Sequence, residues 1–133
     1  MGTSQSPSPD GRRRAITAVG YLVLFVLGVL EGLIGSFQYA QSPTPLIAIV
    51  LVVVIFATCV ASGWGVGTFA AGLLPAVGWI LASFIIAMPR QNGSVVITAT
   101  GAGEWYLYGG ALACVVGSVT AFFTRPRRSA RPR

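Results

Sequence analysis

Three charged residues interrupt a long uncharged stretch, and they are the first candidates for chemistry in this chain. Glu31, Arg90 and Glu104 are the only charges between Ala15 and Thr124. A carboxyl group inside an apolar segment can exchange a proton or bind a cation, and such groups usually mark functional positions. Glu31 is therefore a candidate ion-coupling residue.

The remaining residue types give no support to catalysis. The chain has no His and no Lys, and it lacks a pair of acids on one helix, a phosphate-binding loop and a nucleophile with an identifiable base. Cys59 and Cys114 cannot form the usual four-ligand zinc set without His. We therefore expect no enzyme activity, no catalytic residue, no cofactor and no metal.

Composition indicates a membrane protein. Hydrophobic residues make up 54% of the chain and charged residues only 9%, against roughly 25% charged in soluble domains. A helix needs about 20 apolar residues to cross the hydrocarbon core. The sequence predicts an all-α membrane protein, a four-helix transmembrane bundle with spans at about 15–37, 45–61, 66–88 and 104–124 and an outer loop at 89–103.

The two ends of the chain are basic. Residues 1–14 are rich in Ser, Pro and Arg and are predicted to be a disordered tail, and residues 125–133 form an Arg-rich tail. Eight of the nine Arg lie in these ends, so the positive-inside rule predicts that both termini are cytoplasmic. We expect contact with the lipid bilayer, including anionic lipid at the Arg tails, and no binding of nucleic acid.

The exclusive use of Arg suggests the source of the chain. All basic residues are Arg in a sequence rich in Ala, Gly and Val, which is the bias of a GC-rich genome. This predicts a multi-pass protein of a bacterial plasma membrane.

Small residues at intervals of four predict the helix contacts. Membrane helices associate through close backbone packing at such positions. The first span has Gly28 and Gly32, and the fourth has Gly109, Ala113, Gly117 and Ala121. The second span lacks such a row. We therefore expect it to face mainly lipid, with the first, third and fourth spans in mutual contact.

Glu31 admits two interpretations. It lies about 24 Å of helix rise beyond Ala15, in the outer half of the first span, and it shares a helix face with Gly28, Gly32 and Gly35. One interpretation is proton or cation coupling. The other is a neutral side chain that reaches the outer interface or is hydrogen-bonded to a neighbour, the candidates being backbone carbonyls, Ser36, Thr68, Ser83 and Tyr106.

Glu104 and Arg90 stand at opposite ends of the predicted outer loop. A carboxylate at Glu104 favours the positive end of the fourth helix, and an Arg90–Glu104 pair would close the loop, although an exposed pair contributes at most about 1 kcal/mol. Between them, Asn92-Gly93 is a turn signal and residues 95–98 are β-prone. This segment is predicted to form a small hairpin or to lie across the mouth of the bundle.

Three short segments resemble a known family. Pro89-Arg90, Gly93-Ser94-Val95-Val96 and Trp105-Tyr106-Leu107-Tyr108-Gly109-Gly110, together with four spans and an Arg tail, resemble an uncharacterised family of small four-pass actinobacterial membrane proteins, a domain of unknown function. The resemblance implies the four-span fold and supplies no catalytic residues.

Two functions are compatible with this pattern. The first is a non-enzymatic accessory or structural subunit of the membrane, with a protein partner or a homo-oligomer. The alternative is a small proton- or cation-coupled transporter using Glu31. Small multidrug-resistance transporters also have four short spans and a membrane Glu in the first, although Glu31 here stands late in its helix and the chain has longer Arg ends.

Overall fold

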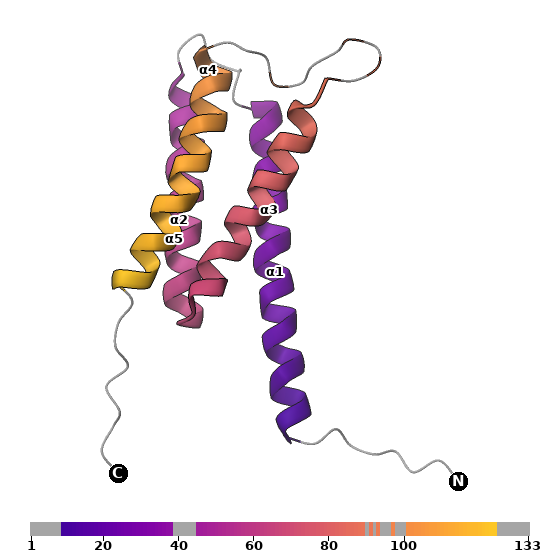
Figure 1. The fold of residues 1–133 in the computed structure, drawn as a ribbon, viewed down its shortest axis with the longest axis vertical. Helices are drawn as coiled ribbons and strands as arrows, with labels where there is room; N and C mark the ends of the chain where they lie inside the picture. The colour runs from indigo at the N-terminus through magenta and orange to yellow at the C-terminus, as the bar shows by residue number, and fades with distance from the viewer. Residues whose placement is uncertain are drawn as a thin grey trace.

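Four helical segments of membrane-spanning length form the described part of the chain, which comprises residues 9–38, 45–89, 91, 93, 97 and 101–124 of a computed structural model. They are α1 (Pro9–Gln38), α2 (Leu46–Val66), α3 (Phe69–Ala87) and a last segment in which α4 (Gly101–Glu104), the π-helix η1 (Trp105–Gly109) and α5 (Gly110–Thr124) are continuous. The segments pack side by side as an all-α bundle, and the described ends of the chain lie at the same end of it (Figure 1). The prediction of a four-helix transmembrane fold is confirmed.

Helix α1 is longer than predicted. Residues 9–14 belong to its first turns, so the prediction that they are disordered is wrong, whereas residues 1–8 and 125–133 lie outside the described residues. Pro9 suits the first turn of a helix, and the Asp10 carboxylate favours its positive end. With 30 residues, α1 is about 45 Å long, and its Arg12–Arg14 segment projects beyond the bundle.

The connection between α2 and α3 lies later than predicted. Residues 62–65, expected to form the turn, are helical, and α2 ends at Val66 rather than near residue 61. Gly67 follows with φ of 76°, a conformation that favours glycine, and its N–H donates to the Gly63 carbonyl. The Thr68 side chain then accepts a hydrogen bond from the Ala71 N–H and begins α3.

Helix α3 is the centre of the bundle. It contacts α1, α2 and α5, and its buried residues include Pro75 and Trp79. Helix α2 packs against both α3 and α5, whereas α1 packs chiefly on α3. The prediction that the second span faces mainly lipid is therefore wrong. Its buried residues include only one glycine and are Ala48, Ile55, Cys59, Ser62 and Gly63.

In the last helical segment, one row of small residues packs against α2 and the adjacent row packs against α3. A Cβ placed on Gly117 would lie 3.0 Å from the Cys59 Cβ, and one placed on Gly63 would lie 2.5 Å from the Ala121 Cβ, so one row faces α2. In the adjacent row, a Cβ on Gly110 would lie 2.3 Å from the Trp79 ring of α3. Ala113 is buried in the first row, and Gly109 at its outer end approaches Val52.

Gly117 and Val52 offer a test of this packing. Gly117→Leu would force its side chain into the Cys59 Cβ and the Phe56 carbonyl, so we expect a loss of about 2–3 kcal/mol. Val52→Leu keeps a branched apolar residue at a half-buried position and should cost less than about 1 kcal/mol. Unfolding of the two variants in detergent measures the difference. Equal resistance to unfolding would contradict the α2–α5 contact.

Ile97, from the segment between α3 and α4, contributes to the core at the end of the bundle opposite Arg12–Arg14. Ile97 is buried and packs in the same core as Ile55, Trp79 and Tyr106. The β-prone run 95–98 otherwise lies outside the described residues, as does Asn92. The last helical segment begins at Gly101, three residues before the predicted start at Glu104.

Candidate functional site

Glu31 lies at the edge of the buried face of α1. Gly28, Gly32, Gly35 and Ser36 are buried on that face, and they bring the α1 backbone against α3 and η1. A Cβ on Gly32 would lie 2.8 Å from the Ala82 Cβ of α3, and one on Gly35 would lie 2.5 Å from the Tyr106 hydroxyl of η1. Glu31 is half-buried beside this stripe, on the side of α1 that faces α2.

The Glu31 carboxyl group is held by a residue of α2. The Thr58 hydroxyl donates to Glu31 Oε1 at 2.5 Å, and it also lies 3.0 Å from the Val54 carbonyl oxygen in its own helix. Glu31 Oε2 is buried and has no hydrogen-bond partner among the described residues. The carboxyl group is thus fixed through one oxygen, while the other is directed into the protein.

The position of Thr58 defines the depth of this carboxyl group. Thr58 is eight residues from the end of α2 at Val66 and twelve from its start at Leu46, or about 12 Å and 18 Å along the helix. Side chains on a helix point toward its N-terminus, which lowers the Glu31 carboxyl group from its own backbone toward the Arg-rich end. The group therefore lies close to the middle of the bundle, deeper than the outer-half position expected from residue counting.

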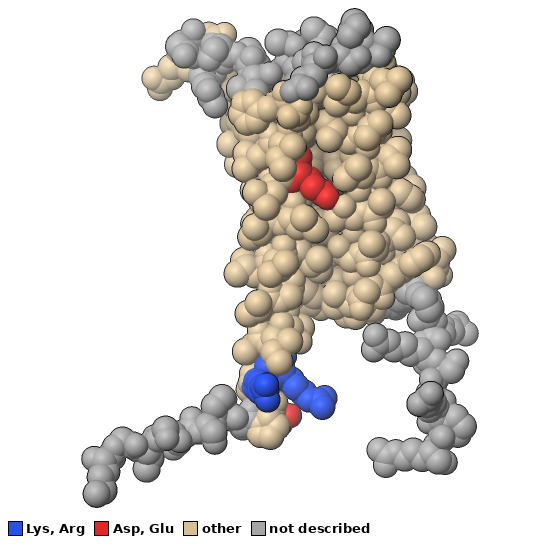
Figure 2. Space-filling model, turned by 180° about the vertical axis from the view of Figure 1, so that it is seen from behind, with Lys and Arg blue, Asp and Glu red and all other residues tan. Residues whose placement is uncertain are grey.

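The surface around Glu31 is apolar. Leu27 and Ile34 share its side of α1, four residues before it and three after, and both are exposed, as is Val54 on α2. Among the described residues, basic side chains occur only at Arg12–Arg14, at one end of α1. Figure 2 shows acidic atoms in the body of an otherwise uncharged face, with the basic cluster far below them.

Thr58 is absent from the partners that the sequence predicts for Glu31. The predicted hydroxyl partners are engaged elsewhere: Ser36 donates to the Gly32 carbonyl, Thr68 contacts Tyr21, and Ser83 contacts Tyr106. The sequence does not predict Thr58 as a partner of Glu31, because the second span is expected to face lipid. The sequence does carry a signal, since Thr58 is the first hydroxyl residue in the apolar run that begins at Leu46.

A second set of polar groups joins η1 to α1 and α3. The Tyr106 hydroxyl donates to the Gly32 carbonyl at 3.0 Å and lies 3.1 Å from the Ser83 hydroxyl. The Tyr106 ring packs edge-on against Trp79, with ring centroids 5.3 Å apart. Both side chains are fully buried. These contacts bind helices together and leave no access to solvent, which is the arrangement of a structural cluster.

The two cysteines lie on facing helices. Cys59 of α2 and Cys114 of α5 are buried free thiols, and the Cys114 thiol lies 4.0 Å from the Ala76 carbonyl oxygen. Ser118, one turn beyond Cys114, donates to the Gly72 carbonyl of α3. In the part of the chain that the structure describes, no group of three His, Cys, Asp or Glu side chains is placed to hold a metal ion.

The predicted loop pair is only half described. Glu104 is the last residue of α4 and is exposed, in the first turn of the last helical segment, where its charge favours the helix dipole. Arg90 lies outside the described residues, so the pair remains a prediction. Glu104 lies at the opposite end of the bundle from Arg12–Arg14, and the structure does not bring it together with Glu31.

Comparison with known proteins gives one match. A family model described as a family of unknown function, DUF6113, matches residues 4–132. No curated protein and no solved structure matches.

Proposed function

We propose that this chain, which belongs to the DUF6113 family of unknown function, is a non-enzymatic accessory or structural subunit that assembles laterally in the membrane. The contact surface in this proposal is the side of α1 and α2 that carries Glu31, Leu27, Ile34 and Val54, here called the Glu31 face. Its partner is another membrane helix, from a different protein or from a second copy of the chain.

The observation that supports this role is the half-buried side chain of Glu31 near the middle of the bundle, beside exposed apolar residues of α1 and α2. Leaving such a group against hydrocarbon costs several kcal/mol. Polar side chains between membrane helices hydrogen-bond across the interface and contribute about 1–2 kcal/mol each. A second helix placed over the Glu31 face would remove the exposed part of this side chain from lipid and could donate a second hydrogen bond to Oε1, which already accepts one from Thr58.

A bulky substitution on this face tests the assembly. Ile34→Trp, three residues from Glu31 and 57% exposed, should prevent close approach of a partner helix and reduce its recovery at least fivefold. Leu22→Trp is the matched control, since Leu22 is 60% exposed and lies nine residues, or two and a half turns, from Glu31 on the opposite side of α1.

The measurement is purification of the tagged full chain from its native membrane in mild detergent, followed by mass spectrometry of the proteins that accompany it. A membrane protein or second copy at fixed stoichiometry, lost in Ile34→Trp and kept in Leu22→Trp, supports the proposal. A chain that is monomeric in its native membrane contradicts it.

The second carboxyl oxygen of Glu31 favours an alternative function, a small proton- or cation-coupled transporter. Glu31 Oε2 is buried without a hydrogen-bond partner among the described residues, and an unpaired carboxyl oxygen can accept a proton or a cation. A small proton- or cation-coupled transporter would use this atom. Purified chain in liposomes should then show flux driven by a proton gradient, and Glu31→Gln should abolish that flux. Absence of flux in the unmodified chain would reject this alternative.

The orientation that we propose places both termini in the cytoplasm of an actinobacterium, with the helices in its plasma membrane. Arg12–Arg14 are exposed at one end of α1, and basic residues beside membrane spans are retained on the cytoplasmic side. A reporter that is active only outside the membrane should be inactive when fused after Arg133 and active when inserted at residue 93. The opposite pattern would reverse the topology.

A further inference from the structure

A groove runs along the outer surface of the last helical segment. Its upper part is a depression of about 390 Å³ lined by Glu104, Trp105, Tyr108, Gly109, Leu112 and Gly101. An adjoining depression of about 280 Å³ continues between α2 and α5, and it shares Trp105, Gly109 and Leu112 with the first. The two depressions thus form one groove, here called the α2–α5 groove.

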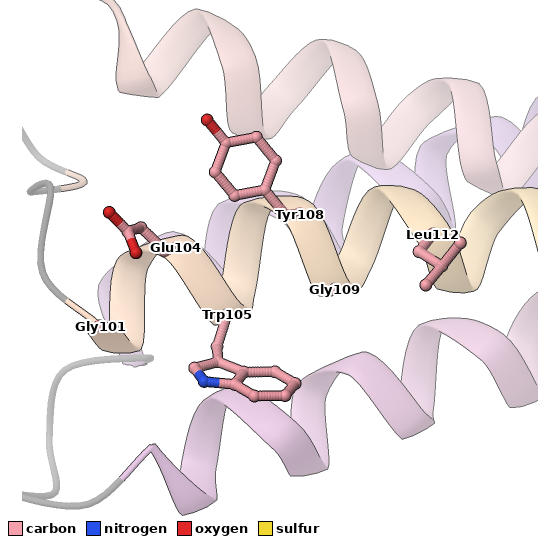
Figure 3. Close-up of a pocket in the computed structure, with 6 residues that line it drawn as sticks. All are labelled: Gly101, Glu104, Trp105, Tyr108, Gly109 and Leu112. Carbon is pink, nitrogen blue, oxygen red and sulfur yellow. The ribbon is translucent and has the colours of Figure 1, made fainter.

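The upper end of the groove carries the groups that recognise an ammonium ion. Glu104 and Tyr108 project from the same side of the helix, and Trp105 projects toward the other rim (Figure 3). The rings of Trp105 and Tyr108 are 56% and 74% exposed, so both can approach a ligand. A carboxylate attracts an ammonium group by charge, and aromatic faces attract it through their quadrupoles.

The lower end of the groove is apolar throughout. Val52, Val53 and Phe56 of α2 line one wall, and Leu112, Ala113 and Val116 of α5 line the other. Gly109 lies at the junction of the two parts, where a side chain would fill the passage, since a Cβ there would lie 3.2 Å from Val52 Cγ2. This part of the groove fits a hydrocarbon chain.

The length of the groove corresponds to one leaflet. From Tyr108 to Val116 the helix rises over eight residues, or about 12 Å, and half of the hydrocarbon core is about 15 Å thick. Trp and Tyr side chains mark the headgroup level. A polar end at that level and an apolar channel of that length match a single phospholipid.

We infer that the α2–α5 groove binds a phospholipid whose headgroup carries a primary ammonium, with the ammonium between Glu104, Trp105 and Tyr108 and one acyl chain against Gly109 and Leu112. The negative charge of Glu104 favours a headgroup with an ammonium over an anionic headgroup. Among the residues that the structure describes, Glu104 is the only acidic residue that lines the groove, and no basic side chain lies at that end of the bundle. An anionic headgroup would be repelled by the same carboxylate.

The test is native mass spectrometry of the purified full chain, released from micelles containing equal amounts of phosphatidylethanolamine and phosphatidylglycerol with identical acyl chains. The unmodified chain should retain phosphatidylethanolamine preferentially. Glu104→Gln should reduce that retention about three- to fivefold, the size expected for one exposed charge contact, and Trp105→Ala should reduce it similarly.

Asp10→Asn is the matched control, because it removes one exposed carboxylate at the opposite end of the bundle and should leave retention unchanged. Equal retention of the two lipids by the unmodified chain would overturn the inference, as would an equal effect of Asp10→Asn and Glu104→Gln. Photocrosslinking from position 105 to a protein rather than to lipid in the native membrane would also overturn it.

Discussion

Gly28→Ala is expected to separate α1 from α3 and to destabilise the bundle more than an alanine at any other glycine of the α1–α3 contact. The added Cβ would lie 2.0 Å from the Pro75 carbonyl oxygen and 2.7 Å from the Pro75 Cα. Both are backbone atoms, which cannot move aside as a flexible side chain can. Overpacking of this kind costs about 3 kcal/mol or more, and the apparent melting temperature in detergent should fall by on the order of 10 °C.

Gly20, also in α1, provides a matched control for Gly28. A Cβ on Gly20 would meet no atom within 4 Å, so Gly20→Ala should be neutral or should stabilise by up to about 1 kcal/mol through helix propensity. Gly78→Ala tests the opposite side of the same crossing, because its Cβ would lie 2.3 Å from the Phe25 carbonyl oxygen of α1. Equal melting temperatures for Gly28→Ala and Gly20→Ala would show that α1 and α3 do not cross at this point.

Glu31→Leu is expected to remove lateral assembly while leaving the isolated chain folded. The substitution deletes the acceptor of the Thr58 hydrogen bond, but Thr58 keeps the Val54 carbonyl as an acceptor, and leucine is favoured in lipid. Unfolding in detergent should therefore change by at most about 1 kcal/mol, the net value of one such hydrogen bond. Losing an interhelical polar contact of about 1–2 kcal/mol should reduce partner recovery about five- to thirtyfold.

Glu31→Gln distinguishes the two functions. Glutamine keeps the size and hydrogen-bonding capacity of a neutral glutamate, so a subunit that assembles through this group should retain its partner. A transporter needs the exchangeable proton or the charge and should lose its flux. Thr58→Val completes the comparison as a near-isosteric removal of the donor to Glu31 Oε1. Equal loss of the partner in Glu31→Gln and Glu31→Leu, with both variants folded, would reject the assembly proposal.

The sequence is sufficient to predict the spans because their information is local. Runs of about 20 apolar residues are determined by the thickness of the hydrocarbon, and this predicts all four segments. The ends are less predictable: α2 continues through residues 62–65 because its stop is the left-handed Gly67 with the Thr68 cap. A glycine at residue 63 or 65 carries the same sequence signal, and only the backbone conformation identifies which one ends the helix.

The packing arrangement is less accessible from sequence because it depends on which faces meet. Counting small residues identifies Gly28 and Gly32, which lie against α3, and Gly117, which lies against α2. The same count misplaces α2, whose contact with α5 is made by Cys59 and Gly63 and by the small residues of the facing helix. Glu31 is recognised from its charge alone, whereas its partner Thr58 can be found only once α1 and α2 are placed side by side.

The central position of α3 has a consequence for biogenesis. Helices are made in chain order, so α1 enters the membrane before the helix that will cover most of its buried face has been synthesised. Until α3 arrives, α2 is the neighbour available to α1, and Thr58 of α2 offers the donor for Glu31. This hydrogen bond is thus a contact that α1 and α2 can form before α3 is made, whereas most of the packing of α1 has to wait for α3.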